Sequence, residues 1–253
     1  MSESSFWSGA ALVSLFATTV AHAQDTWTTR AELGFVAAHG NSSTKTANAK
    51  VEIAREIHDW KYTFATTGLY GRTTGISTAQ HFDARSQANY AFSERSFWFG
   101  ALRYEDDRFS GFDYQTTATT GVGRKFIDTD ATKLSIQIGA GFRALRPEEL
   151  VRDEATDAVL ARIKGERSHD AVANGALSFE HAFNDHTKVI DSLLTEAGQA
   201  NTLTRNDLSL EVKMIRTFAV SIGLSIRHNS EPGPGLQRTD TLTTVNLVYS
   251  NQP

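Results

Sequence analysis

The sequence lacks cysteine, has only 4 prolines in 253 residues, and has no long run of apolar residues. The absence of cysteine excludes disulfide frameworks, thiolate metal sites and cysteine nucleophiles. No apolar segment reaches the roughly 18 residues that a membrane-spanning helix needs, so a helical membrane bundle is excluded too. There is also no excess of positive charge: the formal net charge is -4 and the pI about 6.1. Nucleic-acid binding is therefore not expected.

The first 23 residues differ in character from the rest of the chain. The segment from Phe6 to Val20 is mainly apolar, and it is followed by Ala21-His22-Ala23, a small-x-small cleavage pattern. We predict a secretory signal peptide at residues 1–23 and a mature domain at residues 24–253. Because no Lys or Arg precedes the apolar segment, an apolar N-terminal helix of a cytosolic protein is the alternative.

Apolar and polar residues alternate with a period of two throughout the mature chain. In residues 26–39 the apolar face contains Trp27, Ala31, Leu33 and Phe35, and in residues 218–228 it contains Phe218, Val220, Ile222, Leu224 and Ile226. Such alternation is typical of β-strands with two unlike faces. We predict about twelve strands between residues 26 and 249, of which the ninth, at 187–197, alternates least regularly.

The lengths of the strands and connections predict the fold class. The strands have about 10 to 13 residues, enough to cross a bilayer, and short turns tend to alternate with longer loops. We therefore predict an all-β transmembrane, antiparallel, up-and-down barrel of the bacterial outer membrane, with both termini in the periplasm. Longer loops are expected at residues 72–79, 106–113, 146–167 and 229–237.

Aromatic residues are expected to gather at the two ends of these strands, as in membrane barrels, rather than at random heights as in a soluble β-sandwich. The short-turn end is predicted to carry Trp27, Trp60, Tyr90, Phe92, Trp98, Phe126, Phe183, Phe218 and Tyr249. The loop end is predicted to carry Phe35, Tyr70, Phe82, Tyr104, Tyr114 and Phe142.

One stretch resembles a known family. Residues 103–114, RYEDDRFSGFDY, are similar to the YERDRFSGFDY signature of the salt-induced outer membrane proteins, and residues 40–44 and 227–241 resemble that family's first loop and closing segment. The resemblance implies an outer-membrane barrel of undefined activity. The residues of this motif loop are Asp106, Asp107, Arg108, Phe109, Gly111, Phe112 and Asp113.

The inward face of the barrel is predicted to carry acids and bases in equal numbers. These are Lys50, Glu52, Asp83, Arg85, Arg103, Glu105, Lys133, Arg143, Asp170, Glu180, Glu211, Lys213, Arg227 and Asp240. Equal numbers indicate pairing between neighbouring strands, which would either line a narrow aqueous channel or plug it.

Three further possibilities are weighed against this interpretation. The acidic residues Glu105, Asp106, Asp107 and Asp113 do not have the spacing of a calcium loop, so we expect no metal site and no cofactor. His228, Asn229 and Ser230 have the residue types of a hydrolase triad but are consecutive on a strand, so we expect no enzyme. Residues 147–167 carry acids before bases, which suits a short helix; a flexible loop is the alternative.

The sequence thus predicts an outer-membrane barrel that forms a narrow pore for small solutes or ions, with a role in osmotic or salt stress that the family resemblance implies. The alternative is a non-conducting structural barrel with an ion-paired lumen. The expected partners are outer-membrane lipid and lipopolysaccharide, and the barrel-assembly machinery during biogenesis.

Overall fold

The computed structural model describes residues 25–38, 44–73, 76–107, 112–153, 159–199, 201–233 and 236–251. Among these residues there is no helix long and apolar enough to cross a membrane. The predicted signal peptide lies outside the described residues, as do Arg108, Phe109 and Gly111 of the motif loop.

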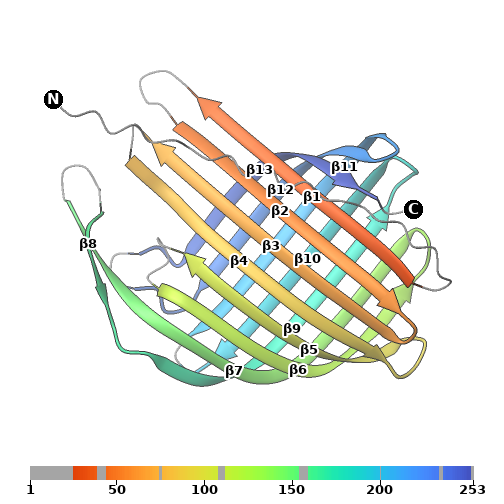
Figure 1. Cartoon of the computed structure of the whole chain (residues 1–253), viewed down its shortest axis with the longest axis horizontal. Helices are drawn as coiled ribbons and strands as arrows, with labels where there is room; N and C mark the ends of the chain where they lie inside the picture. Colours follow the sequence, from red (N-terminus) through yellow and green to blue (C-terminus); the bar gives the residue numbers. More distant parts are fainter. Residues whose placement is uncertain are drawn as a thin grey trace.

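The described chain forms thirteen β-strands, twelve of which close into one antiparallel barrel (Figure 1). Their bounds are β1 Asp25–Ala38, β2 Thr44–Ile57, β3 Trp60–Thr73, β4 Ile76–Ala91, β5 Ser96–Asp107, β6 Phe112–Asp128, β7 Thr132–Arg152, β8 Val159–Lys164, β9 Ser168–Ala182, β10 Thr187–Gly198, β11 Thr202–Ile215, β12 Phe218–Asn229 and β13 Thr239–Ser250. Consecutive barrel strands are neighbours, and the pairings β6–β7 and β1–β13 close the ring. The predicted fold class is confirmed.

The alternation of the sequence becomes the two faces of this wall. In β1, Leu33 and Phe35 are exposed on the outside at 64% and 68%. Glu32, on the same strand, is buried in the interior, with β2 on one side and β13 on the other. The outer face carries a wide band of exposed Leu, Ile, Val and aromatic side chains. Soluble proteins rarely expose a continuous apolar surface of this size to water. A polar interior and an apolar exterior are the arrangement of an outer-membrane barrel, and this protein is one.

Aromatic residues contact one another across strands near both ends of the wall. At the end of the short turns, Trp60 lies 5.0 Å from Tyr90 and Phe218 lies 5.6 Å from Tyr249, measured between ring centroids. At the loop end, Tyr104 contacts both Phe82 and Tyr114. Rings at these heights anchor a barrel at the two membrane interfaces.

Residues 148–152 and 159–164 pair as the two strands of a β-hairpin, so the predicted short helix is wrong. β7 continues to Arg152, beyond the rim, and pairs there with β8 (Figure 1). The acids and bases that suited a helix instead pair across the hairpin, where Arg162 lies 2.7 Å from Glu148. The loop between β3 and β4 is also shorter than predicted, because the strands reach Thr73 and Ile76.

Part of the interior wall is packed with aromatic rings over glycines. Phe99 is 1% exposed and lies over Gly139, where an added Cβ would come within 2.9 Å of the ring. Phe97 covers Gly123 in the same way. These glycines make room for rings inside the barrel, so the lumen beside β5, β6 and β7 is filled by side chains.

Candidate functional site

The candidate site is the charged interior of the barrel. By strand register, the predicted lumen residues fall at positions of the same face: Asp83 is opposite Glu105, Arg85 opposite Arg103, Arg143 opposite Asp170, Lys133 opposite Glu180, and Arg227 opposite Asp240. Lys50 and Glu52 occupy the equivalent positions of β2, opposite Glu32 and Arg30, and Glu211 and Lys213 those of β11.

Charged side chains from opposite walls meet in the middle of the lumen. Arg227 of β12 contacts Glu105 of β5 and lies 2.7 Å from Asp107. Arg205 of β11 lies 3.9 Å from Asp83 of β4. In both cases five strands separate the partners on either side of the ring, so these contacts span the full width of the barrel.

A third contact crosses the lumen at the same end of the barrel. Arg103 of β5 binds both Glu105, on its own strand, and Glu196 of β10, which also lies within 3.5 Å of the Thr117 hydroxyl. We call this group of residues the cross-lumen layer: Asp83, Arg103, Glu105, Asp107, Glu196, Arg205 and Arg227. Each arginine in it contacts at least two carboxylates, which offsets much of the cost of removing the charges from water.

Arg143 and Asp170 form the most deeply buried pair, beside the layer. The Arg143 Nε and Nη2 donate to the two Asp170 oxygens at 3.0 and 2.6 Å, and Nη2 also donates to the Asn201 carbonyl at 3.1 Å. Arg143 is fully buried. Two parallel hydrogen bonds fix both side chains in one orientation, so this pair ties β7 to β9 and to the chain before β11.

A second set of contacts lies on the opposite part of the wall. Arg30 of β1 is 2.6 Å from Glu211 of β11 and 3.0 Å from Glu32. Lys188 lies 4.0 Å from the same Glu211 and 3.5 Å from Glu180. Arg30–Glu211 links β1 to β11, which are not neighbours, whereas Lys188 pairs with acids on the two strands beside its own, so positive and negative side chains are paired here as well.

Four of the predicted lumen charges are exposed to solvent, namely Arg85, Lys133, Lys213 and Asp240. Lys133 and Lys213 lie near the turn end and Asp240 near the loop end. Arg85 lies in the interior of β4, at the position next to Asp83 on the same face. An exposed Arg85 means that water reaches the lumen directly beside the cross-lumen layer, so the barrel is not filled along its whole length.

The described residues of the motif loop lie in different surroundings. Asp107 belongs to the cross-lumen layer, Asp106 lies on the outer face, and Asp113 lies 2.8 Å from Lys164 and 3.7 Å from Arg146 at the base of the hairpin. Phe112 is half-buried opposite Asp107. The motif thus joins the lumen charges to the β7–β8 hairpin.

One cluster has the donor types of a metal site. His81 Nδ1 lies 3.4 Å from an Asp107 oxygen and 3.9 Å from a Glu105 oxygen. The guanidinium of Arg227 contacts the same two carboxylates. A positive group therefore already occupies the side of the cluster that a cation would take, and the cluster is better described as part of the ion-pair layer.

Several lumen charges were missed by the sequence analysis: Arg30, Glu32, Lys188, Glu196, Arg205 and Asp207. Arg205 and Asp207 alternate with Leu208 and Leu210, so strict application of the period would have found them. Glu196 lies in the irregular ninth strand of the barrel, where alternation gives little guidance. His228 is exposed on the outer face and Asn229 is buried inside, as consecutive strand residues must be.

Three solved structures are similar in fold. The translocator domain of the autotransporter NalP from Neisseria meningitidis matches with a TM-score of 0.49 at 10% identity, covering 90% of this chain and 89% of that one. The NanC porin matches with 0.48 at 10% identity, covering 90% and 100%. An outer membrane channel from Pseudomonas putida F1 matches with 0.47 at 6% identity, covering 92% and 97%. Likenesses this distant do not bear on function.

No curated protein matches the chain in sequence. One family profile does, and it covers nearly the whole barrel, from residue 31 to residue 250. The chain therefore belongs to the family described as "Protein of unknown function, DUF481".

Proposed function

We propose that this protein is a narrow outer-membrane channel for small solutes or ions, closed in this structure by the cross-lumen layer. The contact of Arg227 with Glu105 and Asp107 across the full width of the barrel carries the proposal. Water reaches Arg85 next to that layer, so a constriction lies between an accessible lumen and the loop end. Charged rings at a constriction are a common means of controlling permeation.

The layer also suits control, because its members can exchange partners. Arg103, Arg205 and Arg227 together contact five carboxylates, four in the layer and that of Asp207, and each arginine contacts two of them. A rotation of Arg227 away from β5 breaks the contact across the barrel while Glu105 keeps its bond to Arg103. This rotation removes one of the three contacts across the lumen without leaving Glu105 unpaired.

Conductance in planar bilayers tests the proposal. Refolded full-length protein is compared with the Arg205→Ala/Arg227→Ala double variant, which lacks the arginines of β11 and β12 in the layer. We expect brief, small conductance steps from the unmodified barrel and larger, longer steps from the double variant. If both proteins insert, run as folded species on gels and remain silent, the channel is overturned.

The second candidate is a non-conducting structural barrel, and the balance of charge in the lumen favours it. Arg143–Asp170 joins the neighbouring strands β7 and β9, and Arg30–Glu211 joins β1 to β11, without any excess of one sign. Silence of both proteins in the same bilayer experiment would support this function.

A role under salt or osmotic stress is proposed from the sequence resemblance. Deleting the gene should then impair growth at high salt but not at low salt. Restoring growth with the unmodified barrel, and failing to restore it with a variant that does not conduct, would connect the stress role to the channel. Equal growth of the deletion and parent strains at every salt concentration would contradict it.

A further inference from the structure

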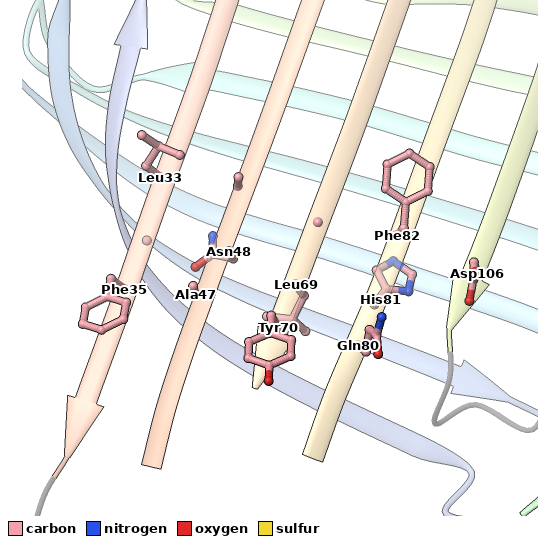
Figure 2. Close-up of a pocket in the computed structure, with 13 residues that line it drawn as sticks. Leu33, Phe35, Ala47, Asn48, Leu69, Tyr70, Gln80, His81, Phe82 and Asp106 are labelled. Carbon is pink, nitrogen blue, oxygen red and sulfur yellow. The ribbon is translucent and has the colours of Figure 1, made fainter. Parts of the chain in front are cut away.

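An apolar groove runs across the outer wall near the loop end (Figure 2). Its volume is about 640 Å³. Leu33 and Phe35 of β1 form one side, and Tyr70 of β3 and Phe82 of β4 form the other. All four side chains are exposed, at 64, 68, 44 and 47% respectively.

The groove exists because its floor carries almost no side chains. Ala47 and Ala49 of β2 and Gly68 of β3 lie between the large residues, and a Cβ added at Gly68 would meet nothing within 4 Å. In register, Ala47 lies between Phe35 and Tyr70, so a small residue separates two aromatic rings in one row. The hollow is continuous with the lipid-facing band, and a flexible apolar chain fits it better than a rigid polar ligand.

Two positive side chains stand directly above this row. Lys45 and Arg72 are opposite each other in the β2–β3 register, two residues beyond Ala47 and Tyr70 along their strands, and both are exposed. Their position, just beyond the aromatic ring of Tyr70, is the height at which lipid headgroups meet a barrel.

We propose that the groove and the Lys45–Arg72 pair bind one phosphorylated, acylated lipid of the outer leaflet. An acyl chain lies on Ala47, Ala49 and Gly68 between the aromatic walls, and the lipid phosphate lies between the ammonium of Lys45 and the guanidinium of Arg72. The acyl chain covers apolar side chains that are exposed on the outer wall. The lipid is lipid A, the phosphorylated anchor of lipopolysaccharide, because the loop end faces the outer leaflet when both termini lie in the periplasm, as the sequence predicts.

Asp106 lies at the far rim of the groove, on β5, beyond Phe82. β4 separates it from the strand of Arg72. The carboxylate is therefore not placed between the two cations, and it is expected to repel the phosphate only weakly. Asp106→Asn should leave lipid affinity unchanged or strengthen it slightly.

Native mass spectrometry of the folded full-length barrel, titrated with purified lipid A, tests the site. We expect one tightly bound lipid. Lys45→Gln and Arg72→Gln should each weaken binding about fivefold, the effect of one basic residue near an anionic headgroup. Gly68→Leu should also weaken binding, by filling the floor. The matched controls are Arg124→Gln, an exposed cation at the turn end, and Gly175→Leu on the outer wall of β9, where an added Cβ likewise meets nothing within 4 Å.

The probes separate the two halves of the ligand. Lipid A without its phosphates should bind weakly and should not respond to Lys45→Gln, whereas inorganic phosphate alone should not compete at millimolar concentration. If phosphate alone competes, the cations form a simple anion site and the lipid proposal is wrong. Equal lipid A affinity of the unmodified barrel, Lys45→Gln/Arg72→Gln and Gly68→Leu also overturns it. Should Gly68→Leu fail to fold, Ala47→Leu replaces it. None of these readouts depends on conductance.

Discussion

Arg227 on β12 lies 2.7 Å from Asp107 on β5, although five strands stand between them in either direction around the barrel. A contact of this kind requires both side chains to reach the axis of the lumen. The contact also links β12 to β5, the strand that leads into the motif loop. The width of the open lumen therefore depends on where this guanidinium and those of Arg103 and Arg205 lie.

Removal of the layer's arginines is expected to make the channel select cations. The Arg205→Ala/Arg227→Ala variant removes two of the layer's three guanidinium groups and keeps its four carboxylates, so negative charge dominates the constriction. The reversal potential across a potassium chloride gradient measures this preference. Lys61→Ala is the control, because Lys61 forms an exposed pair with Glu56 near the turn end. A variant that prefers chloride would contradict the assignment of the constriction.

Replacing Arg143 should destabilise the barrel strongly. Arg143→Met keeps the volume but leaves the Asp170 carboxylate buried without its partner, which costs about 3–5 kcal/mol. The free energy of unfolding by urea, measured in lipid vesicles, reports the loss.

The control for Arg143 is Lys125→Met. Lys125 and Asp128 form an exposed pair at 3.0 Å, so the same chemical change should cost less than about 1 kcal/mol there. Arg143→Met/Asp170→Leu should recover part of the loss, because it removes both charges. Equal costs at Arg143 and Lys125 would show that water reaches Asp170.

Gly123 and Gly175 are expected to respond differently to the same substitution. Gly123→Ala places a methyl group against the ring of Phe97 and should destabilise the barrel by about 1–3 kcal/mol. Gly175→Ala enters open space on the outer wall and should be neutral or stabilising, because glycine is a poor strand residue. Unfolding in vesicles compares them, and equal effects would contradict the packing of Phe97 on Gly123.

Asp191 and Asn206 form a polar pair on the outer face, where the Asn206 amide donates to Asp191 at 2.7 Å between β10 and β11. Replacing both with leucine should raise the free energy of unfolding by about 1–2 kcal/mol, because acidic groups on the lipid face are unfavourable. Both must change, since Asp191→Leu alone deprives the amide of its acceptor.

The contrasting variant for this pair is Asp207→Leu, one residue along β11 on the lumen face. Asp207 accepts from Arg205 at 3.1 Å and from the Ser225 hydroxyl at 2.6 Å, so its loss should destabilise the barrel. If the Asp191→Leu/Asn206→Leu barrel is less stable than the unmodified one, this part of the wall does not face lipid.

Much of the wall could be predicted from the sequence because the information is local. Leu33 and Phe35 alternate with Glu32, and any strand must place them on opposite faces. The same rule applied to β11 would have found Arg205 and Asp207. It gave less help in β10, where Asp191 lies on the outer face and interrupts the pattern, so Glu196 was missed.

The β7–β8 hairpin shows the limit of local patterns. Glu148 and Arg162 belong to an acid-to-base gradient that suits a helix, yet they pair across two strands at 2.7 Å. The same charges satisfy both arrangements. The structure adopts the hairpin because β7, which pairs with β6 and β9 in the barrel, continues as a strand beyond the rim.

The sequence by itself determined that this chain forms an outer-membrane barrel with charges inside and apolar residues outside, because a period of two and the length of a strand are local properties. Only the tertiary structure decided which charges meet. Whether Arg227 reaches Asp107 depends on the register around the closed ring, which brings residues 120 positions apart to one height. Whether Lys45 lies beside Arg72 depends on the register of the β2–β3 pair. Because the ring closes, acids and bases that are far apart in the sequence meet in a layer across the lumen.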